Sequence, residues 1–359
     1  MNNNKGKRRR NNIYKSLIIS LFILIIFITS VFIYSVATDY QPPKKEIVFK
    51  NNFKDTITQK IISVLSWNIG YCGLGKDMDF FYDGGEKVRD SKKATLNNLK
   101  KIVSFISKRD TVDFILLQEV DKMSKRSYFI NQFDSLKTKL SSYYATFALN
   151  YNVKYVPIPL LSPLGKVKAG IVTFSKKRSV ISSRYSFPGN FPMPKKSFML
   201  DRCFLENKYQ LKNGKKLILV NTHLSAYDNG TLKQQQMQYL KKFIVNEYRK
   251  GNYVIVGGDW NQLPSGTSPG KFNKLQTENV VLKNVKKDFL PQSWKWIFDK
   301  NTSTNRSLEA KYLPEKTHTS IIDFFVISPN IKGLCVETIN LRFENSDHQP
   351  IIATFSFKN

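Results

Sequence analysis

Cysteine is scarce in this 359-residue chain, which has only Cys72, Cys203 and Cys335. Three residues are too few for a disulfide framework, and their spacing matches no zinc-binding motif. The sequence also lacks internal repeats and low-complexity tracts. Apolar residues, in contrast, are abundant: 41% of the chain is hydrophobic and 13% is aromatic. This content supplies a sizeable core for one large domain or two ordinary ones and argues against disorder.

Acidic residues are few as well, since 27 Asp and Glu stand against 57 Lys and Arg, a net charge of +30. A surface of this charge attracts polyanions such as nucleic acid, anionic lipid or cell-wall polymers. A general compositional bias toward Lys, Asn and Ile explains the same excess equally well. Charge alone therefore identifies no partner, and nothing in the sequence predicts a protein partner.

The amino terminus carries a basic cluster followed by a long uncharged run. Residues 16–37 are apolar over a length that crosses a bilayer as one helix. Because Lys and Arg are retained on the cytoplasmic side, residues 1–15 are predicted to be cytoplasmic and the rest extracytoplasmic. A signal peptide cleaved near Ala37 is the alternative, although the run is longer than usual for one. Polar residues 38–58, which include a Pro pair, are predicted to form a stalk.

Residues 59–359 are predicted to form one domain in which short apolar strands alternate with helices. Helices are expected over 93–109 and 230–249, and Lys212-Asn213-Gly214 is typical of a type I′ hairpin turn. Residues 262–318 are expected to be a long ordered loop region. Two strand-rich halves predict two packed sheets flanked by helices. The predicted strands are 61–67, 112–120, 143–149, 169–175, 179–186, 200–208, 216–222, 253–259, 321–328, 336–343 and 350–357.

Polar residues recur where the apolar strands end. One such residue is usually a helix cap or a loop contact, but six occurrences in one chain are hard to explain in that way. Strand ends are rigid positions from which side chains are held accurately. The residues are Asn68, Glu119, His223, Asp259 with Asn261, Asp323, and Asp347 with His348.

The ordered motifs WNIG, LLQEV, NTHLS, GGDWN, IDFFVIS and SDHQPI resemble those of the endonuclease/exonuclease/phosphatase superfamily. The resemblance covers residue 60 to the carboxyl terminus. It implies an α/β fold, a four-layer α/β sandwich of two packed mixed sheets, and hydrolysis of phosphate esters. Catalysis of that reaction depends on positioning and on stabilising charge on the phosphoryl oxygens. A hard divalent cation with carboxylate and amide oxygen ligands meets this need.

The resemblance also implies which residues hold the metal. Glu119 is the implied main ligand, with Asn68 supporting it directly or through water, and Asp347 is a carboxylate on the metal side. The implied ion is Mg²⁺, while Mn²⁺ and Ca²⁺ remain alternatives that prefer the same oxygen ligands.

The catalytic roles follow from the resemblance in the same way. Asp259 is implied to orient or deprotonate the attacking water, and Asn261 to donate to a phosphoryl oxygen. His348 is implied to face the phosphate while Asp323 fixes its tautomer. His223, in the NTHL motif, is implied to protonate the leaving oxygen. It is typical of the deoxyribonuclease, sphingomyelinase and phosphatase branches rather than the abasic-site enzymes.

Substrate contacts are less well defined by the sequence. Arg126 and Arg202 are candidates to bind a phosphate, and a solvated or packing role is equally compatible with each. Residues 71–86 follow the Asn68 motif directly and are predicted to lie on the rim of the site. Residues 187–198 and Trp294-Lys295-Trp296 are candidates for a hairpin that enters membranes.

Three functions are compatible with this pattern. A surface nuclease agrees with the basic charge, because such an enzyme follows a phosphate backbone. A lipid headgroup phosphodiesterase of the sphingomyelinase kind, or a phosphatase, agrees with the membrane segment. A non-catalytic binding module on the same fold is disfavoured because every catalytic residue type is retained.

Overall fold

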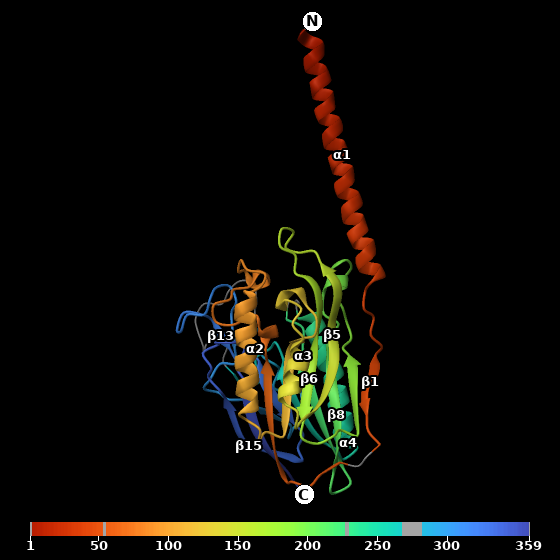
Figure 1. Cartoon of the computed structure of the whole chain (residues 1–359). Helices are drawn as coiled ribbons and strands as arrows, with labels where there is room; N and C mark the ends of the chain where they lie inside the picture. Colours follow the sequence, from red (N-terminus) through yellow and green to blue (C-terminus); the bar gives the residue numbers. More distant parts are fainter. Residues whose placement is uncertain (1, 53–54, 227–229, 268–281, 359) are drawn as a thin grey trace.

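Two β-sheets packed face to face form the centre of the computed structural model (Figure 1). The structure describes residues 2–52, 55–226, 230–267 and 282–358. The first sheet has the strand order β1 (Lys45–Lys50), β7 (Ile181–Ser186), β8 (Cys203–Leu211), β9 (Lys216–His223), β10 (Tyr253–Asp259), β14 (Asp323–Ile327) and β11 (Lys295–Ile297), with β2 (Thr56–Ile57) beside β8. The second has the order β15 (Ile331–Thr338), β16 (Ile351–Phe357), β3 (Ile61–Asn68), β4 (Phe114–Asp121), β6 (Gly165–Ser175) and β5 (Tyr144–Val156). A small pair, β12 (Asn305–Arg306) and β13 (Thr319–Ser320), stands apart.

The inner faces of the two sheets enclose one apolar core. Val64 and Leu116 of the second sheet meet Leu219, Ile255 and Phe325 of the first, and all five are fully buried. Each such side chain contributes about 1.5–3 kcal/mol by leaving water. The alternation of these residues along their strands fixes the register of both sheets.

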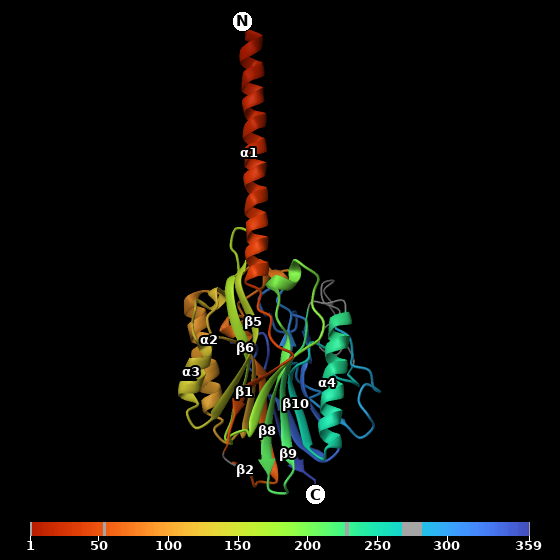
Figure 2. The same cartoon turned by 90° about the vertical axis from the view of Figure 1, so that its right-hand side faces the viewer.

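Helices cover the two outer faces. Figure 2 shows α2 (Lys92–Ser107) and α3 (Gln132–Lys139) on one side and α4 (Thr231–Arg249) on the other. Ser91 caps α2 by accepting a hydrogen bond from the N–H of Ala94 at 3.1 Å. The buried stripe of α2, Leu99, Ile102 and Ile106, packs on the second sheet. The layers run helix, sheet, sheet, helix, which confirms the predicted four-layer sandwich.

A long helix, α1 (Asn2–Ala37), extends away from the sandwich at its amino-terminal end (Figures 1 and 2). Residues Arg10–Ala37 are long and apolar enough to cross a membrane, and the apolar window is not buried against the rest of the protein. A signal sequence has the same properties. The carboxyl-terminal end of α1 approaches the domain (Figures 1 and 2), and α1 contacts β5 and the 3₁₀ helix η4 (Lys195–Phe198).

The predicted stalk is partly wrong. Within residues 38–58, β1 pairs antiparallel with β7 and β2 pairs parallel with β8. Ile57 is buried in the core between the sheets. The folded unit therefore begins near Lys45, because the β-branched and aromatic residues of KEIVFK complete a sheet edge. Residues 53–54 lie outside the described structure.

Three local predictions also differ from the structure. Strand β15 lies five residues earlier than expected, and the expected segment is not extended as far as residue 343 because Arg342 and Phe343 take positive φ. Gly214 has φ +79° and Asn213 is not among the positive-φ residues, so the turn is not type I′. The expected loop 262–318 contributes β11 to the first sheet, and its residues 268–281 lie outside the described structure.

Candidate active site

The polar residues singled out by the sequence meet where the central strands of both sheets end. β3 and β4 run parallel in one sheet, and β9 and β10 run parallel in the other. Asn68, His223 and Asp259 are the last residues of β3, β9 and β10. Asp323 begins the antiparallel strand β14, where it pairs with Asp259. The carboxyl ends of three strands and the amino end of the antiparallel β14 therefore place four of the predicted residues at one end of the sandwich.

Unusual backbone geometry aims two further side chains into this site. The register of β4 shifts between Leu117 and Val120, and Glu119 within this bulge has φ +56°. Asn261 has φ +49°, a conformation that Asn tolerates. Non-glycine residues in this region cost about 1–3 kcal/mol and concentrate at functional sites. Gly258 in the same exit has φ +144°, and a Cβ there would lie 2.0 Å from the carbonyl oxygen of Thr222.

Asn68 connects the two sheets through its side-chain amide. Its Nδ2 donates to Oε1 of Glu119 at 3.2 Å and to Oδ2 of Asp259 at 3.1 Å. Its Oδ1 accepts the N–H of Gly70 at 3.0 Å. Asn68 thus fixes the positions of both carboxylates, in addition to any contact with a metal.

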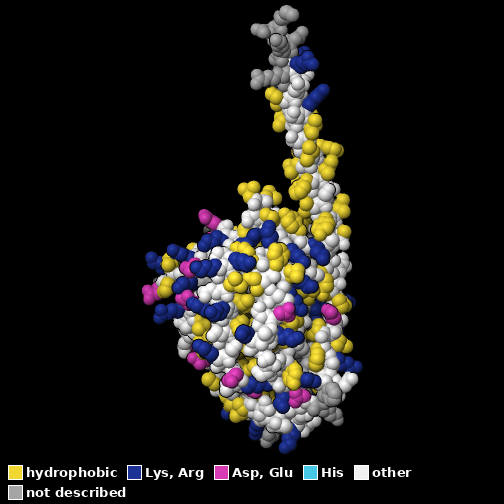
Figure 3. Space-filling model, viewed as in Figure 1, with side chains coloured by type: hydrophobic (Ala, Val, Ile, Leu, Met, Phe, Trp, Pro, Cys, Tyr) yellow, Lys and Arg dark blue, Asp and Glu magenta, His cyan; other side chains and the backbone are white. Residues whose placement is uncertain are grey.

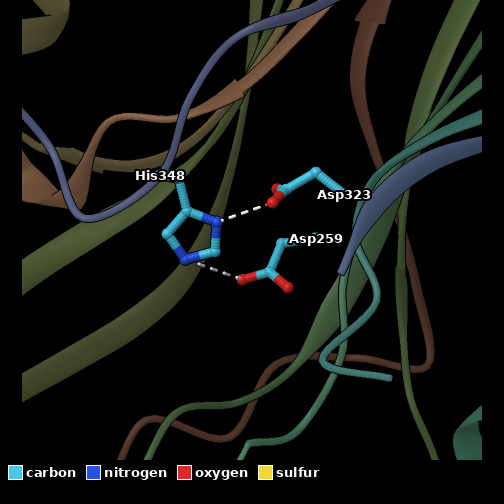
Figure 4. A group of neighbouring side chains, drawn as sticks. All are labelled: Asp259, Asp323 and His348. Carbon is cyan, nitrogen blue, oxygen red and sulfur yellow. Dashed lines mark hydrogen bonds and ion pairs between the residues drawn. The ribbon is translucent and has the colours of Figure 1, made fainter. Parts of the chain in front are cut away.

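His348 lies between two carboxylates (Figure 4). Its Nδ1 is 2.8 Å from Oδ2 of Asp323, and its Nε2 is 3.8 Å from Oδ2 of Asp259. Burial opposes protonation, but the carboxylates of Asp323, Asp259 and Asp347 outweigh it and raise the pKa of His348 well above its usual value. His348 is therefore an imidazolium, and its contact with Asp323 fixes the orientation of the ring.

His223 differs from His348 because its surroundings disfavour the protonated form. Its Nε2 is 3.4 Å from Oδ2 of Asp259 and 4.0 Å from Oε1 of Glu119. Burial, together with the positive charges of Arg202, His348 and Arg126, holds the pKa of His223 well below its usual value. The imidazole is therefore neutral in the free protein. A negative charge bound beside this imidazole would favour its protonation.

The oxygen donors present fit a hard divalent cation. Glu119 and Asp347 are close enough for the charge of Glu119 to raise the pKa of Asp347, and burial is the main cause of the rise to about 7. A cation between these groups would compensate two charges that burial otherwise disfavours. Asp259, Asp323 and His348 also lie close enough together to hold an ion. His348 is already bonded to Asp323 through Nδ1, so the Glu119 side offers the better site.

The predicted residues surround one cavity of about 180 Å³. Asn68 and Asp323 are not part of its lining and support it from behind. Part of its lining is apolar and aromatic and includes Tyr82 of the 71–86 segment. The predicted residues in the lining are Glu119, Arg126, Arg202, His223, Asp259, Asn261, Asp347 and His348.

Arg126 lines the cavity but is bound within the protein. Its Nε and Nη2 donate to the two carboxylate oxygens of Asp121 at 3.2 and 2.9 Å. Its guanidinium lies 3.8 Å from the ring centroid of Tyr71. The guanidinium group of Arg126 is thus bound to Asp121, which favours the packing role for Arg126. Arg202 also lines the cavity.

Replacing Arg126 with Met is expected to destabilise the fold by about 3–5 kcal/mol, because Asp121 is left buried without its cation. The measurement is the free energy of unfolding in urea. Arg178→Met, at a more exposed arginine, is the matched control and should change it by less than about 1 kcal/mol. Unchanged stability of the Arg126 variant would contradict the structural role.

Two cavity residues were missed by the site prediction. The amide of Asn305 lies 3.1 Å from Nε2 of His348. His318 lines the cavity, and its buried Nδ1 has no hydrogen-bond partner among the described residues. Both come from the irregular stretch 262–318, where no strand-end pattern marks them. The only available signal was that His318 precedes the Asp323 strand.

Comparisons with known proteins agree with this architecture. The model of the endonuclease/exonuclease/phosphatase family matches residues 65–348. The structure is similar to an endonuclease/exonuclease/phosphatase from Beutenbergia cavernae, with a TM-score of 0.56 and 16% identity, over 84% of this chain and 72% of that chain. It is similar to D. rerio TDP2 complexed with single strand DNA product, with a TM-score of 0.52 and 16% identity, over 83% and 100% of the two chains. No curated protein sequence matches the chain. At these identities the structural likeness concerns the fold.

Proposed function

Since the chain belongs to the endonuclease/exonuclease/phosphatase family, a family of phosphoester hydrolases, we propose that it is a membrane-anchored, Mg²⁺-dependent phosphodiesterase. The catalytic domain works outside the cytoplasm, and water attacks the phosphorus atom. Residues 1–15 are cytoplasmic, 16–37 form the anchor, and the following residues to 359 carry the catalytic domain.

One observation carries the proposal: a single carboxylate oxygen of Asp259 faces three of the other predicted site residues. Oδ2 of Asp259 lies 3.1 Å from Nδ2 of Asn68, 3.4 Å from Nε2 of His223 and 3.8 Å from Nε2 of His348. Burial raises the pKa of Asp259; the imidazolium of His348 opposes the rise and the carboxylate of Asp323 adds to it. A carboxylate made more basic in this way is suited to accept a proton from water.

Members of this family generally use divalent metal ions, and Glu119, Asp347 and Asn68 are the residues that would hold one here. A bound Mg²⁺ supplies electrostatic stabilisation of the charge on the phosphoryl oxygens. The protein fixes the geometry of that site, because Asn68 and the bulge in β4 hold Glu119 in place.

Of the remaining residues, two transfer protons and two stabilise charge on the phosphate. Asp259 accepts a proton from the attacking water. The imidazolium of His348 and the amide of Asn261 stabilise phosphoryl oxygens; one amide hydrogen of Asn261 bonds to the carbonyl of Leu224 at 3.0 Å, which leaves the other for substrate. His223 gains a proton with the bound phosphate and donates it to the leaving oxygen.

A comparison of leaving groups tests the role of His223. With bis(p-nitrophenyl) phosphate, whose leaving group needs no proton, His223→Ala is expected to lower kcat by less than tenfold. With an alkyl phosphodiester the same change should lower kcat by about 10²–10⁴-fold. His318→Ala, at a cavity histidine outside the six motifs, is the matched control. Equal losses of His223→Ala on both substrates would contradict the assignment.

Two substrate classes are distinguished by their physical signatures. Nucleic acid is favoured by the net charge of +30, and its cleavage should fall steeply with salt. A phospholipid headgroup is favoured by the apolar cavity wall, which includes Leu74, Leu164 and Leu200. The test is Mg²⁺-dependent hydrolysis of plasmid DNA, RNA, sphingomyelin, phosphatidylcholine and a phosphomonoester by the full chain. Cleavage of a lipid without cleavage of nucleic acid would exclude the nuclease.

A further inference from the structure

The hairpin that joins β5 to β6 exposes apolar side chains at its tip. Residues 157–164 read PIPLLSPL and contain no charge. Leu161 is fully exposed, Leu160 is 82% exposed, and Ile158 is 40% exposed. Single exposed apolar side chains are ordinary. Here, however, two adjacent leucines are the most exposed large hydrophobic residues of the described chain. They form an apolar tip that contributes nothing to the core of the domain.

This hairpin tip (residues 157–164) lies at the same end of the domain as α1. In both views the yellow-green loop rises past the carboxyl-terminal end of α1 to the level of its last turns, and in Figure 1 it stands to one side of the helix (Figures 1 and 2). The end of α1 also approaches β5 and η4, and Nζ of Lys196 lies 3.7 Å from Oδ2 of Asp39. The tip is therefore at the level of the apolar helix and not below it.

The surroundings of the tip are graded from apolar to basic. Tyr155 is 38% exposed just below the tip, and Lys154 beside it is exposed. Met193 is 46% exposed on the segment that leads into η4, where Nζ of Lys195 lies 4.1 Å from the ring centroid of Phe191. Apolar, Lys and Arg side chains cluster at this end of the domain (Figure 3). Leucine at the tip with Tyr and Lys behind it is the order that fits a membrane interface with anionic lipids.

We propose that the hairpin tip is a second membrane contact, inserted into the outer leaflet of the bilayer that α1 crosses. A single helix tethers the domain without orienting it, whereas a helix and a hairpin together fix its orientation. Leu164 at the base of the hairpin and Leu200 just after η4 both line the catalytic cavity. The contact thus holds the cavity wall close to the lipid surface. This inference rests on the anchoring by α1 proposed above and is independent of the reaction.

Site-directed spin labelling of the full chain tests the contact. The protein is placed in nanodiscs of phosphatidylcholine and phosphatidylglycerol, with Cys335→Ser removing the exposed thiol. A label at Leu161→Cys is compared with Ile25→Cys in α1 and with Leu334→Cys, which is 45% exposed on β15 at the far end of the domain.

The label at residue 161 is expected to collide more with oxygen and several-fold less with a water-soluble nickel complex than the label at residue 334. Nickel collisions at residue 161 equal to those at residue 334, with residue 25 protected, would overturn the contact while leaving the anchor intact. Nickel collisions at residue 25 would overturn the anchor and this inference together.

A double variant, Leu160→Asp with Leu161→Asp, tests the contact from the opposite side. The two side chains are almost fully exposed, so the variant should fold with an unchanged Tm. A label at Tyr155→Cys should then collide several-fold more often with the nickel complex. An unchanged collision rate at residue 155 would show that the tip does not hold this surface at the bilayer.

Discussion

Replacing Asp259 with Asn is expected to lower kcat for phosphodiester hydrolysis by about 10³-fold or more. The amide has the shape of the carboxylate but accepts no proton from water. It also removes the negative charge that faces His223 and His348 at 3.4 and 3.8 Å. The measurement is steady-state kinetics at saturating Mg²⁺ and substrate, with far-UV circular dichroism to verify the fold.

The matched control for Asp259→Asn is Asp110→Asn, an exposed carboxylate just after α2. It should keep the activity of the unaltered protein within twofold. Combining Asp259→Asn with His348→Gln should cost little more than Asp259→Asn alone, because residues that act as one unit are strongly non-additive. A loss below tenfold for Asp259→Asn would mean that another group accepts the proton.

Removing the divalent ion is expected to abolish hydrolysis. The Mg²⁺ concentration that restores hydrolysis should depend on the side chain of Glu119. After chelation with EDTA, Mg²⁺ should restore full activity to the unaltered protein. Glu119→Gln should raise the Mg²⁺ concentration required for half of the maximal activity by about 100-fold, because the variant loses a charged oxygen ligand and the position is tightly constrained. Glu46→Gln, on the exposed edge strand β1, is the control and should not change it.

The pH dependence of Mg²⁺ binding gives this prediction a second observable. Burial raises the pKa of Asp347 to about 7, so the carboxyl group is protonated below that pH and ionised above it. Mg²⁺ binding should therefore weaken as the pH falls through 7, because the ion must displace a proton. A Mg²⁺ affinity that is flat between pH 6 and pH 8, or equal for Glu119→Gln and Glu46→Gln, would place the metal elsewhere.

Where residues follow apolar strands, the sequence indicated which of them the structure brings together. Asn68, His223 and Asp259 end their strands and point to one place, because parallel strands finish at the same edge. The pairing of His348 with Asp323 was also anticipated, although the two residues are 25 positions apart. The resemblance to the family rested on the order of the six motifs along the chain. That order constrains the site more than any single motif does.

Other features depend on geometry that a sequence does not display. The β4 bulge that turns Glu119 inward leaves no mark in LLQEV. Asn305 reaches His348 from an irregular segment, and its position depends on the pairing of β12 with β13. Trp294 and Trp296, one of two candidates for a hairpin that enters membranes, instead pack in the apolar cluster that includes α4. The exposed leucines at 160 and 161 had no periodicity to single them out.

The most direct measurement of the proposed chemistry is hydrolysis in water enriched in oxygen-18. The purified full chain is incubated with Mg²⁺ and a phosphodiester, and the products are analysed by mass spectrometry. One oxygen-18 atom should enter the phosphomonoester product and none the alcohol, and incorporation should fall to background with EDTA or with Asp259→Asn. Label in the alcohol, or equal incorporation by Asp259→Asn and the unaltered protein, would contradict attack of water on phosphorus assisted by Asp259.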